Sequence, residues 1–286
     1  MFLSEGDVIA VMDGLKKWGY EPVEGKHVCQ EVRTLQDCLD DLTWALEDPE
    51  VKAIFCVRGG YAASEVMDIL PLSMIANAGK LIIGYSDISV YHAAWTTAGL
   101  PSIHASMSAA FTDLPEACAE AERRLLKGEI PSCRCDSSSY CCEGTAEGIL
   151  IGGNLSTFNA VLGTPYDSSM DQPYIIFLED VDEDLQHIHR FLTVLKHMGV
   201  FERAEGIIFG EWTDVPADSG DYSGNSRGGR FECVADMLCR EILEDLEIPV
   251  AFGFPAGHGD ENYPMLFGET VRLGVSAESY TLEWAE

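Results

Sequence analysis

Short apolar runs alternate with amphipathic segments along the first half of the chain. The runs at residues 51–57, 81–84 and 101–105 predict buried strands. Apolar residues recur at helical spacing in residues 4–19, 34–46, 64–69 and 90–95, and residues 116–127 predict a charged, exposed helix. Strands that alternate with helices favour parallel pairing, which brings the carboxyl ends of the strands to one edge of the sheet.

The second half has a more mixed pattern. Strands are predicted at residues 147–151, 174–178, 206–210, 249–252, 270–273 and 280–284, the last two antiparallel. Helices are predicted from 154 to 162, 188 to 198 and 231 to 246, with a polar, glycine-rich loop at 214–229. Residues 129–144, rich in Pro, Ser and Cys, predict a linker between domains 1–128 and 145–286. We therefore expect an α/β protein, with a mostly parallel three-layer α/β N-terminal domain and a C-terminal α/β domain with mixed or antiparallel strands.

Composition narrows the possible partners. The chain has 286 residues, enough for two domains, and 18 Lys and Arg against 48 Asp and Glu give a formal charge of -30. That charge would repel nucleic acid and anionic membranes, so neither is an expected partner. The sequence predicts neither a secretory signal nor a membrane span.

Ten cysteines are present, scattered except for a cluster of four, namely Cys133, Cys135, Cys141 and Cys142. No C-x-x-C spacing occurs among them, so we predict reduced thiols in a cytoplasmic protein and no metal site.

The segment Gly84-Tyr85-Ser86-Asp87 follows a predicted strand and precedes a predicted helix. A serine on such a turn points away from the sheet, where it could act as a nucleophile, although Ile88 replaces the second glycine of the G-x-S-x-G pattern. The alternative is that Ser86 and Asp87 only cap the helix. Gly59 and Gly60 end the preceding strand, so we expect them beside Ser86 at the same sheet edge.

A nucleophilic serine needs a base, most often a histidine oriented by a carboxylate. His258 lies between two glycines in a loop, which makes it the best candidate, although a simple turn residue would look the same. His104, near a strand end, is a second candidate, and His92 is expected to be a surface or packing residue. His187 and His189 are two apart on a helix and cannot both serve one site.

Five segments together resemble one family. They are RGGY (58–61), IIGYSDIS (82–89), GILIGGNLSTFNAVLGTPY (148–166), IIFLEDVDE (175–183) and GFPAGH (253–258). In their order and spacing they resemble the signatures of the LD-carboxypeptidases, serine peptidases that include murein tetrapeptide carboxypeptidases and microcin C self-immunity peptidases. The resemblance extends from about residue 8 to the end of the chain, and five ordered motifs are far more specific than one.

The resemblance implies a catalytic triad of Ser86 as nucleophile, Glu179 as orienting carboxylate and His258 as base. The N–H of Asp87 and the glycine pair Gly59 and Gly60, Gly60 above all, are expected to stabilise the oxyanion. The mechanism needs no metal or organic cofactor.

Three further residues match family positions. Asn154 is expected to contact substrate or to cap its own helix. Arg58 and Arg190 could hold a substrate carboxylate, but we expect buried structural ion pairs.

The implied activity is hydrolysis, through an acyl-enzyme, of the amide that joins an L-centre to a C-terminal D-amino acid, as in a murein tetrapeptide. The resemblance also implies a cytoplasmic homodimer. One alternative is cleavage of a peptidyl-aspartate to nucleotide amide, with Trp212, Tyr222 or Phe254 against the base; others are an esterase and a catalytically silent peptide-binding protein. Compared with the family, the chain lacks a first strand before its first helix, has a shorter segment at 29–36, and carries Ala62 where glycine is common.

Overall fold

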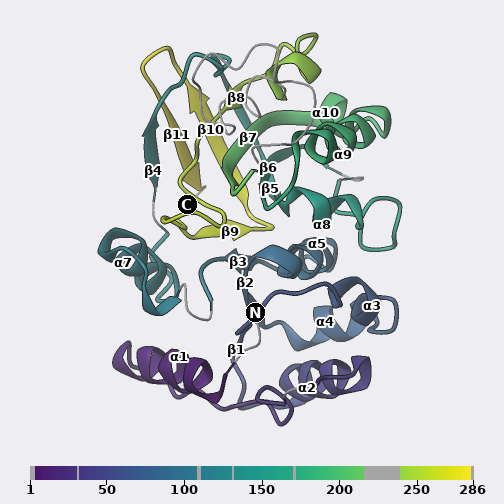
Figure 1. The fold of residues 1–286 in the computed structure, drawn as a ribbon, viewed down its shortest axis with the longest axis vertical. Helices are drawn as coiled ribbons and strands as arrows, with labels where there is room; N and C mark the ends of the chain where they lie inside the picture. Colours follow the sequence, from purple (N-terminus) through teal and green to yellow (C-terminus); the bar gives the residue numbers. More distant parts are fainter. Residues whose placement is uncertain are drawn as a thin grey trace.

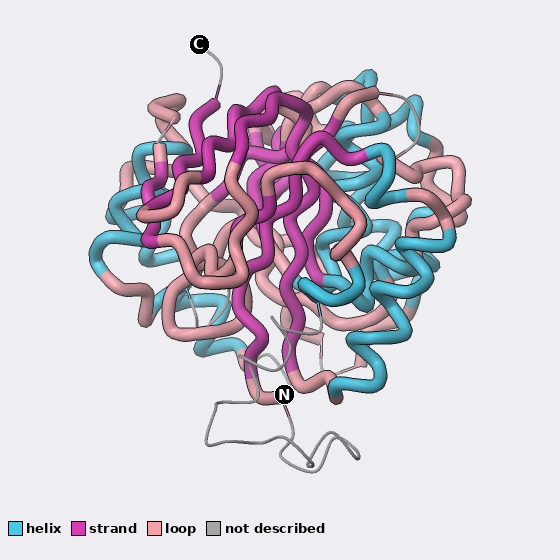
Figure 2. The backbone as a smooth tube through the Cα atoms, turned by 90° about the horizontal axis from the view of Figure 1, so that it is seen from above, coloured by secondary structure: helices cyan, strands magenta, loops and turns pink. Residues whose placement is uncertain are grey.

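A computed structural model of the chain describes residues 4–30, 32–107, 111–130, 132–169, 172–215 and 239–284. Two sheets form the centre of the molecule, and helices flank them (Figures 1 and 2). The first half of the chain builds the lower part in Figure 1, and most of the second half builds the upper part.

The first sheet has the strand order β1-β2-β3-β9. Its parallel strands are β1 (Ala53–Phe55), β2 (Leu81–Gly84) and β3 (Ser102–His104), and β9 (Met265–Phe267) pairs with β3 in the antiparallel direction. Because β9 comes from near the end of the chain, the second half contributes directly to the sheet that precedes Ser86.

Helices cover both faces of this sheet, which gives three layers (Figure 1). One face carries α1 (Glu5–Lys17) and α7 (Glu116–Leu125), and the other carries α2 (Leu35–Glu47), α3 (Ala63–Met67), α4 (Leu72–Ala78) and α5 (Ser89–Thr97). Ile82 of β2 packs toward the second group, whereas Ile83 packs toward α7, as the alternation of a strand requires.

The second sheet has the order β4-β11-β10-β5-β6-β7-β8. Its strands are β4 (Cys133–Asp136), β11 (Ser279–Trp284), β10 (Thr270–Val275), β5 (Gly144–Asn154), β6 (Tyr174–Val181), β7 (Ala204–Thr213) and β8 (Val250–Ala251). The pairs from β4 to β5 are antiparallel and those from β5 to β8 are parallel. The predicted fold class, a mostly parallel first sheet and a mixed second sheet, is confirmed.

Helices α8 (Leu155–Asn159), α9 (Leu185–His197) and α10 (Val200–Arg203) pack on one face of β5 to β8. The opposite face buries Phe177 and Ile208 against residues of β9, β10 and β11. Both faces of the parallel strands are therefore buried, which explains why β6 is apolar almost throughout.

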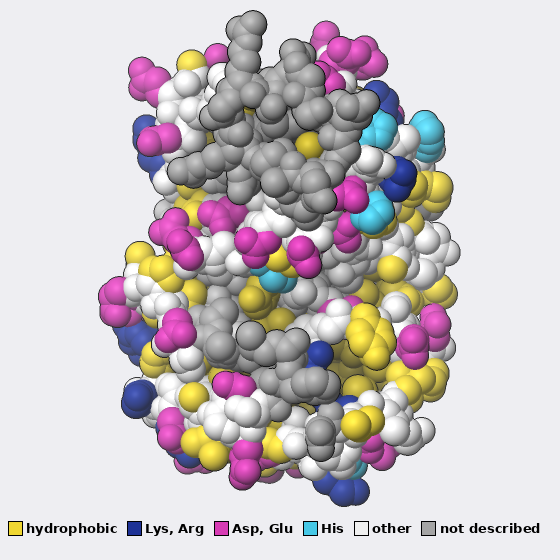
Figure 3. All heavy atoms as spheres, viewed as in Figure 1, with side chains coloured by type: hydrophobic (Ala, Val, Ile, Leu, Met, Phe, Trp, Pro, Cys, Tyr) yellow, Lys and Arg dark blue, Asp and Glu magenta, His cyan; other side chains and the backbone are white. Residues whose placement is uncertain are grey.

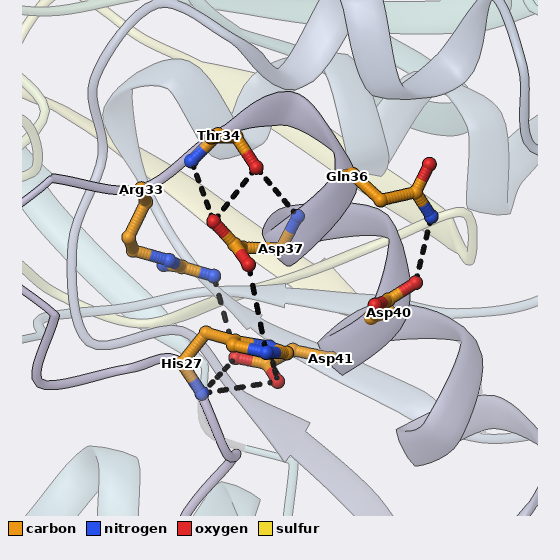
Figure 4. A network of polar contacts seen from close by, with 7 residues as sticks. All are labelled: His27, Arg33, Thr34, Gln36, Asp37, Asp40 and Asp41. Atoms are coloured by element: carbon orange, nitrogen blue, oxygen red, sulfur yellow. Dashed lines mark hydrogen bonds and ion pairs between the residues drawn. The ribbon is translucent and has the colours of Figure 1, made fainter.

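A polar network fixes the connection into α2 (Figure 4). Thr34 and Asp37 form the capping box that begins the helix. One turn further on, Asp41 accepts hydrogen bonds from the backbone N–H and Nδ1 of His27, the latter at 2.9 Å, and lies 3.5 Å from the Arg33 guanidinium. The short segment before α2 is thus tied to a helix of the layer that covers β2.

The structure differs from the expected elements in three places. The strand expected at 51–57 is only β1, and it is partly exposed because it is an edge strand. Helix α7 is not simply exposed, since it buries one face that includes Cys118 and Glu122. The segment 129–144, expected as a linker, contains β4, which pairs with β11.

Among the described residues from Ser4 onward, α1 precedes β1. Most of the loop predicted at 214–229 and the first half of the helix predicted at 231–246 lie outside the described residues.

Candidate active site

Ser86 lies on a strained turn at the end of β2. Its φ is 66°, in the left-handed region that side chains other than glycine rarely adopt, and such a conformation costs about 1 kcal/mol or more. The 3₁₀ turn η1 (Ser86–Ile88) and helix α5 follow, and neither begins with a side-chain cap. Ser86 is therefore not a helix cap, and the turn has the form of a nucleophile elbow despite the missing second glycine.

Two contacts of His92 fix the backbone just before this turn. Its Nε2 lies 3.0 Å from the carbonyl oxygen of Gly84, and its Nδ1 lies 2.9 Å from the Ser102 hydroxyl. Since a carbonyl only accepts, Nε2 donates to it and Nδ1 accepts from Ser102. Burial lowers the pKa of His92 to about 4, so the ring is neutral. His92 is a packing residue, as predicted, and it fixes the residue two positions before Ser86.

Gly59 lies directly against Ser86, and Gly60 lies near the Asp87 carboxylate. A Cβ built at Gly59 would be 3.1 Å from both Cβ and Oγ of Ser86 and 3.5 Å from the amide nitrogen of Asp87. Gly60 has φ 146°. The expected adjacency of the two turns is confirmed, and the replacement at Ala62 causes no strain there, since its φ is -101°.

The Asp87 carboxylate stabilises the fold through a backbone hydrogen bond. Its Oδ2 accepts a hydrogen bond of 3.1 Å from the backbone N–H of Ala63, at the start of α3. Burial raises the pKa of Asp87, although the N–H donors of Ala63 and Ala62 oppose that shift. The group that Asp87 offers beside Ser86 is therefore its backbone N–H, as expected.

Glu179 and His258 form a direct pair. The Glu179 carboxylate, at the end of β6, is fully buried, and its Oε2 lies 2.8 Å from Nδ1 of His258. A carboxylate accepts, so Nδ1 carries the proton and Nε2 is left as the basic nitrogen. Burial would lower the pKa of His258, but the charge of Glu179, its hydrogen bond and the charge of Asp180 together raise it.

Close packing fixes the His258 ring. Gly257 has φ 138°, and a Cβ there would come within 2.9 Å of Oε2 of Glu179. On its other side, the His258 ring packs on Tyr85, with 4.7 Å between ring centroids. Tyr85 directly precedes Ser86, so this contact joins the turn of the first sheet to the histidine loop of the second half.

Asn262 links that loop to the buried His104. Oδ1 of Asn262 lies 3.2 Å from the backbone N–H of Gly257 and 3.2 Å from Nε2 of His104. The oxygen accepts both bonds, so His104 donates from Nε2. Burial holds the pKa of His104 well below its usual value. His104 is therefore a neutral, fully buried support for the loop and not the base that its position allowed.

Both polar atoms of the Asn154 side-chain amide form hydrogen bonds within the protein. Its Oδ1 accepts from the N–H of Thr157, which caps α8, and its Nδ2 donates to Asp180 at 2.6 Å. Its backbone N–H donates to the hydroxyl of Ser89 on α5 at 2.9 Å. The helix cap, one of the two expected roles, is what these contacts support, and the Ser89 bond ties the two halves together beside the site.

The expectation for the two arginines fails, and His187 lies apart from the Glu179–His258 pair. Arg58 and Arg190 are exposed and form no ion pair among the described residues, so the prediction of buried structural pairs is wrong. His187 is an exposed residue of α9, bonded to Glu183 at 2.9 Å, and takes no part in the pair above.

Acidic side chains gather beside the histidine loop. The Glu211 carboxylate lies so close to Gly259 that a Cβ there would overlap it. Burial raises the pKa of Glu211, and so do the charges of Glu261, Asp260 and Glu179. Figure 3 shows Asp and Glu side chains gathered between the two halves of the molecule on this face.

The described residues contain neither a group of side chains arranged for a metal ion nor a membrane-spanning helix. No group of three or more His, Cys, Asp or Glu within them is arranged to hold a metal ion. Across the same ranges, no helix is long and apolar enough to cross a membrane.

The sequence matches two family models, described as the LD-carboxypeptidase N-terminal domain at residues 3–105 and the LD-carboxypeptidase C-terminal domain at residues 147–273. A murein tetrapeptide carboxypeptidase from Pseudomonas aeruginosa is 27% identical over 96% of this chain and 89% of its own. The microcin C7 self-immunity protein MccF from Escherichia coli is 24% identical over 91% and 81% of the two chains.

Solved structures show the same fold. The muramoyltetrapeptide carboxypeptidase from Oxalobacter formigenes superposes with a TM-score of 0.86, 24% identity and coverage of 100% of this chain and 96% of the other. MccF in its apo state gives 0.81 with 19% identity, over 98% and 91%. The two matched domains cover most of the sequence, and the chain belongs to the LD-carboxypeptidase family.

Proposed function

We propose that this chain is a serine LD-carboxypeptidase that releases a C-terminal D-alanine from murein tetrapeptides, with Ser86, Glu179 and His258 as its catalytic triad. The observation that carries the proposal is the buried Glu179–His258 pair, packed through Tyr85 against the strained Ser86 turn. Family membership supplies the peptidase class, and the named relatives supply the substrate.

The first half of the reaction forms an acyl-enzyme. Nε2 of His258 takes the proton of Ser86 as Oγ attacks the carbonyl carbon of the scissile amide. The N–H groups of Asp87 and Gly60 stabilise the resulting oxyanion, each worth about 10² or more in rate. The histidine then gives its proton to the departing amine of D-alanine, and the acyl group stays on Ser86.

Water completes the cycle. Nε2 of His258 takes a proton from a water molecule, which attacks the ester carbon, and the proton returns to Oγ as the tripeptide acid leaves. Throughout, Glu179 keeps the imidazole in the productive tautomer and stabilises its cationic form. The same two N–H groups serve both tetrahedral intermediates.

Cleavage of a peptidyl-nucleotide amide is the competing reaction, as MccF is named a microcin self-immunity protein. Two of the three aromatic residues considered for stacking a base, Trp212 and Phe254, are buried in the apolar core, and Tyr222 lies outside the described residues. The burial of Trp212 and Phe254 removes two of the residues that could stack against a base.

The test is D-alanine release from a murein tetrapeptide by the parent protein and by Ser86→Ala. The expected result is release by the parent and a loss of at least about 10³-fold in the variant. A tetrapeptide ending in L-alanine, a simple ester and a peptidyl-aspartate nucleotide amide are run beside it. Turnover of only one of the last two would replace the proposal with the corresponding alternative, and equal release by Ser86→Ala would refute the nucleophile.

A further inference from the structure

Two cysteine thiols lie side by side on β4, at the far edge of the second sheet from β8. Cys133 and Cys135 are two residues apart on this strand, so both side chains point to the same face, and their Sγ atoms are 3.6 Å apart. Both side chains are partly accessible. The pair is separate from the residues of the triad.

Their surroundings make the two thiols unequal. Either thiol can donate its S–H to the other at this distance. The hydrogen bond between them lowers the pKa of Cys135, although burial opposes that shift. The same hydrogen bond and burial raise the pKa of Cys133. By contrast, a hydrogen bond to Glu24 raises the pKa of the exposed Cys29 to about 11. At neutral pH a larger fraction of Cys135 than of Cys29 is therefore thiolate, although Cys135 is less exposed.

The strand geometry allows a disulfide but strains it. Residues two apart on a strand have Cα atoms about 6.4 to 6.8 Å apart, at the upper end of the range that disulfides span. Closing the bond requires the sulfur atoms to approach from 3.6 Å to about 2 Å. Because β4 is a four-residue strand at the edge of the described sheet, paired there with β11, it has room to pucker. A strained disulfide is easily reduced again.

We propose that Cys133 and Cys135 form a reversible, hydroperoxide-sensitive dithiol site. The Cys135 thiolate attacks a peroxide oxygen, which breaks the O–O bond and gives a sulfenic acid and, after protonation, water. The Cys133 sulfur then attacks the Cys135 sulfur and displaces a second water. In total, two thiols lose two electrons and two protons to one hydrogen peroxide, and two waters form. This inference is independent of the proposed peptidase activity.

The test is hydrogen peroxide treatment of the full chain, followed by trypsin and mass spectrometry without reduction. Trypsin cuts after Arg134, between the two cysteines, so a bond from Cys133 to the next peptide keeps two tryptic peptides joined. Fragmentation of the joined pair then assigns the partner of Cys133 among Cys135, Cys141 and Cys142, which share one tryptic peptide. We expect this joined pair after oxidation and its separation after dithiothreitol. In Cys133→Ser, we expect a sulfenic acid at Cys135 that dimedone traps, and Cys29→Ser is the control that still forms the pair.

Alkylation rates give a second, independent measurement. At neutral pH, iodoacetamide should label Cys135 at least about tenfold faster than Cys29, because a larger fraction of Cys135 is thiolate. Equal rates, peptides joined through Cys141 in place of Cys135, or bonds between two chains would each overturn the proposal. Folding of every variant is checked by thermal unfolding, and a variant that does not fold leaves the parent protein's rates and joined peptides to decide.

Discussion

The two halves of the site position their reactive groups in different ways. On the first sheet, backbone geometry places Ser86: its φ is left-handed, Gly59 packs against its side chain, and His92 holds the carbonyl of Gly84. None of these three features is a hydrogen bond to the Ser86 side chain. This half should therefore be most sensitive to added volume at the turn.

In the second half of the chain, side-chain hydrogen bonds and charges position the base, His258. Glu179 binds His258, Asp180 adds a second negative charge, and Asn262 holds the loop through the N–H of Gly257. This half should respond to the loss of a charge or an acceptor at constant volume. The difference gives a direct way to separate the two kinds of positioning by mutation.

The largest effect is expected from Glu179→Gln. The amide keeps the volume but removes the charge, and its NH₂ group can turn toward Nδ1 of His258 and favour the wrong tautomer. We expect kcat/KM on the tetrapeptide to fall by about 10³- to 10⁴-fold. Glu205→Gln, on an exposed residue of β7, is the matched control. A loss below tenfold would mean that the pair does not orient the base.

A smaller but clear effect is expected from Gly59→Ala. The added methyl would lie 3.1 Å from Oγ of Ser86, a tight contact that shifts the nucleophile by a few tenths of an ångström. Since a misplacement of about 1 Å can cost about 10²-fold, we expect this smaller shift to lower kcat by about tenfold or more. Gly6→Ala, where the methyl meets only ordinary contacts in α1, should leave kcat unchanged. Equal kcat values for both variants would contradict the steric placement of Ser86.

Local sequence was enough to find the turn and the ends of the key strands. Ser86 follows an apolar run and glycine, and Glu179 ends the apolar run of β6, so their positions at strand ends followed from pattern alone. The pairing of Glu179 with His258 rested on family resemblance, because it joins residues 79 positions apart. No periodicity encodes such a contact.

The other contacts that position the site could not be predicted, for the same reason. Asn262 is 158 residues from His104, and Tyr85 meets His258 only because the two halves dock. Similarly, the charged residues of α7 gave no sign that Glu122 would be buried on the face that packs on the first sheet. Arg58 was expected to be buried from its family position, but it lies in an exposed turn after the edge strand β1.

A moderate effect is expected from Asn262→Ala. The substitution removes the acceptor that holds the N–H of Gly257, so the His258 loop loses one restraint. We expect kcat to fall by about tenfold with KM little changed, because the base and not substrate binding is disturbed. Asn262→Asp keeps an acceptor oxygen and should recover part of kcat. If Asn262→Asp shows the same loss as alanine while both remain folded, Asn262 has no positioning role.

The smallest effect is expected from Asp180→Asn, and it is seen in the pH profile. His258 must be neutral to take the proton of Ser86, so kcat/KM falls as pH drops through its pKa, which is raised above 6.5. Burial and the charge of Glu179 raise the pKa of Asp180 to about 6, so Asp180 is mostly charged above that pH. Removing that charge makes the imidazolium less stable and lowers the pKa of His258.

The acid limb of kcat/KM should therefore move to lower pH in Asp180→Asn, while kcat/KM at pH 8 changes by only about twofold. Asp184→Asn, at the start of α9 and farther along the chain from Glu179, is the control for a general charge effect. A limb that stays in place, or that moves to higher pH, would show that Asp180 does not act on the imidazole through its charge. The positioning of His258 would then depend on hydrogen bonds alone.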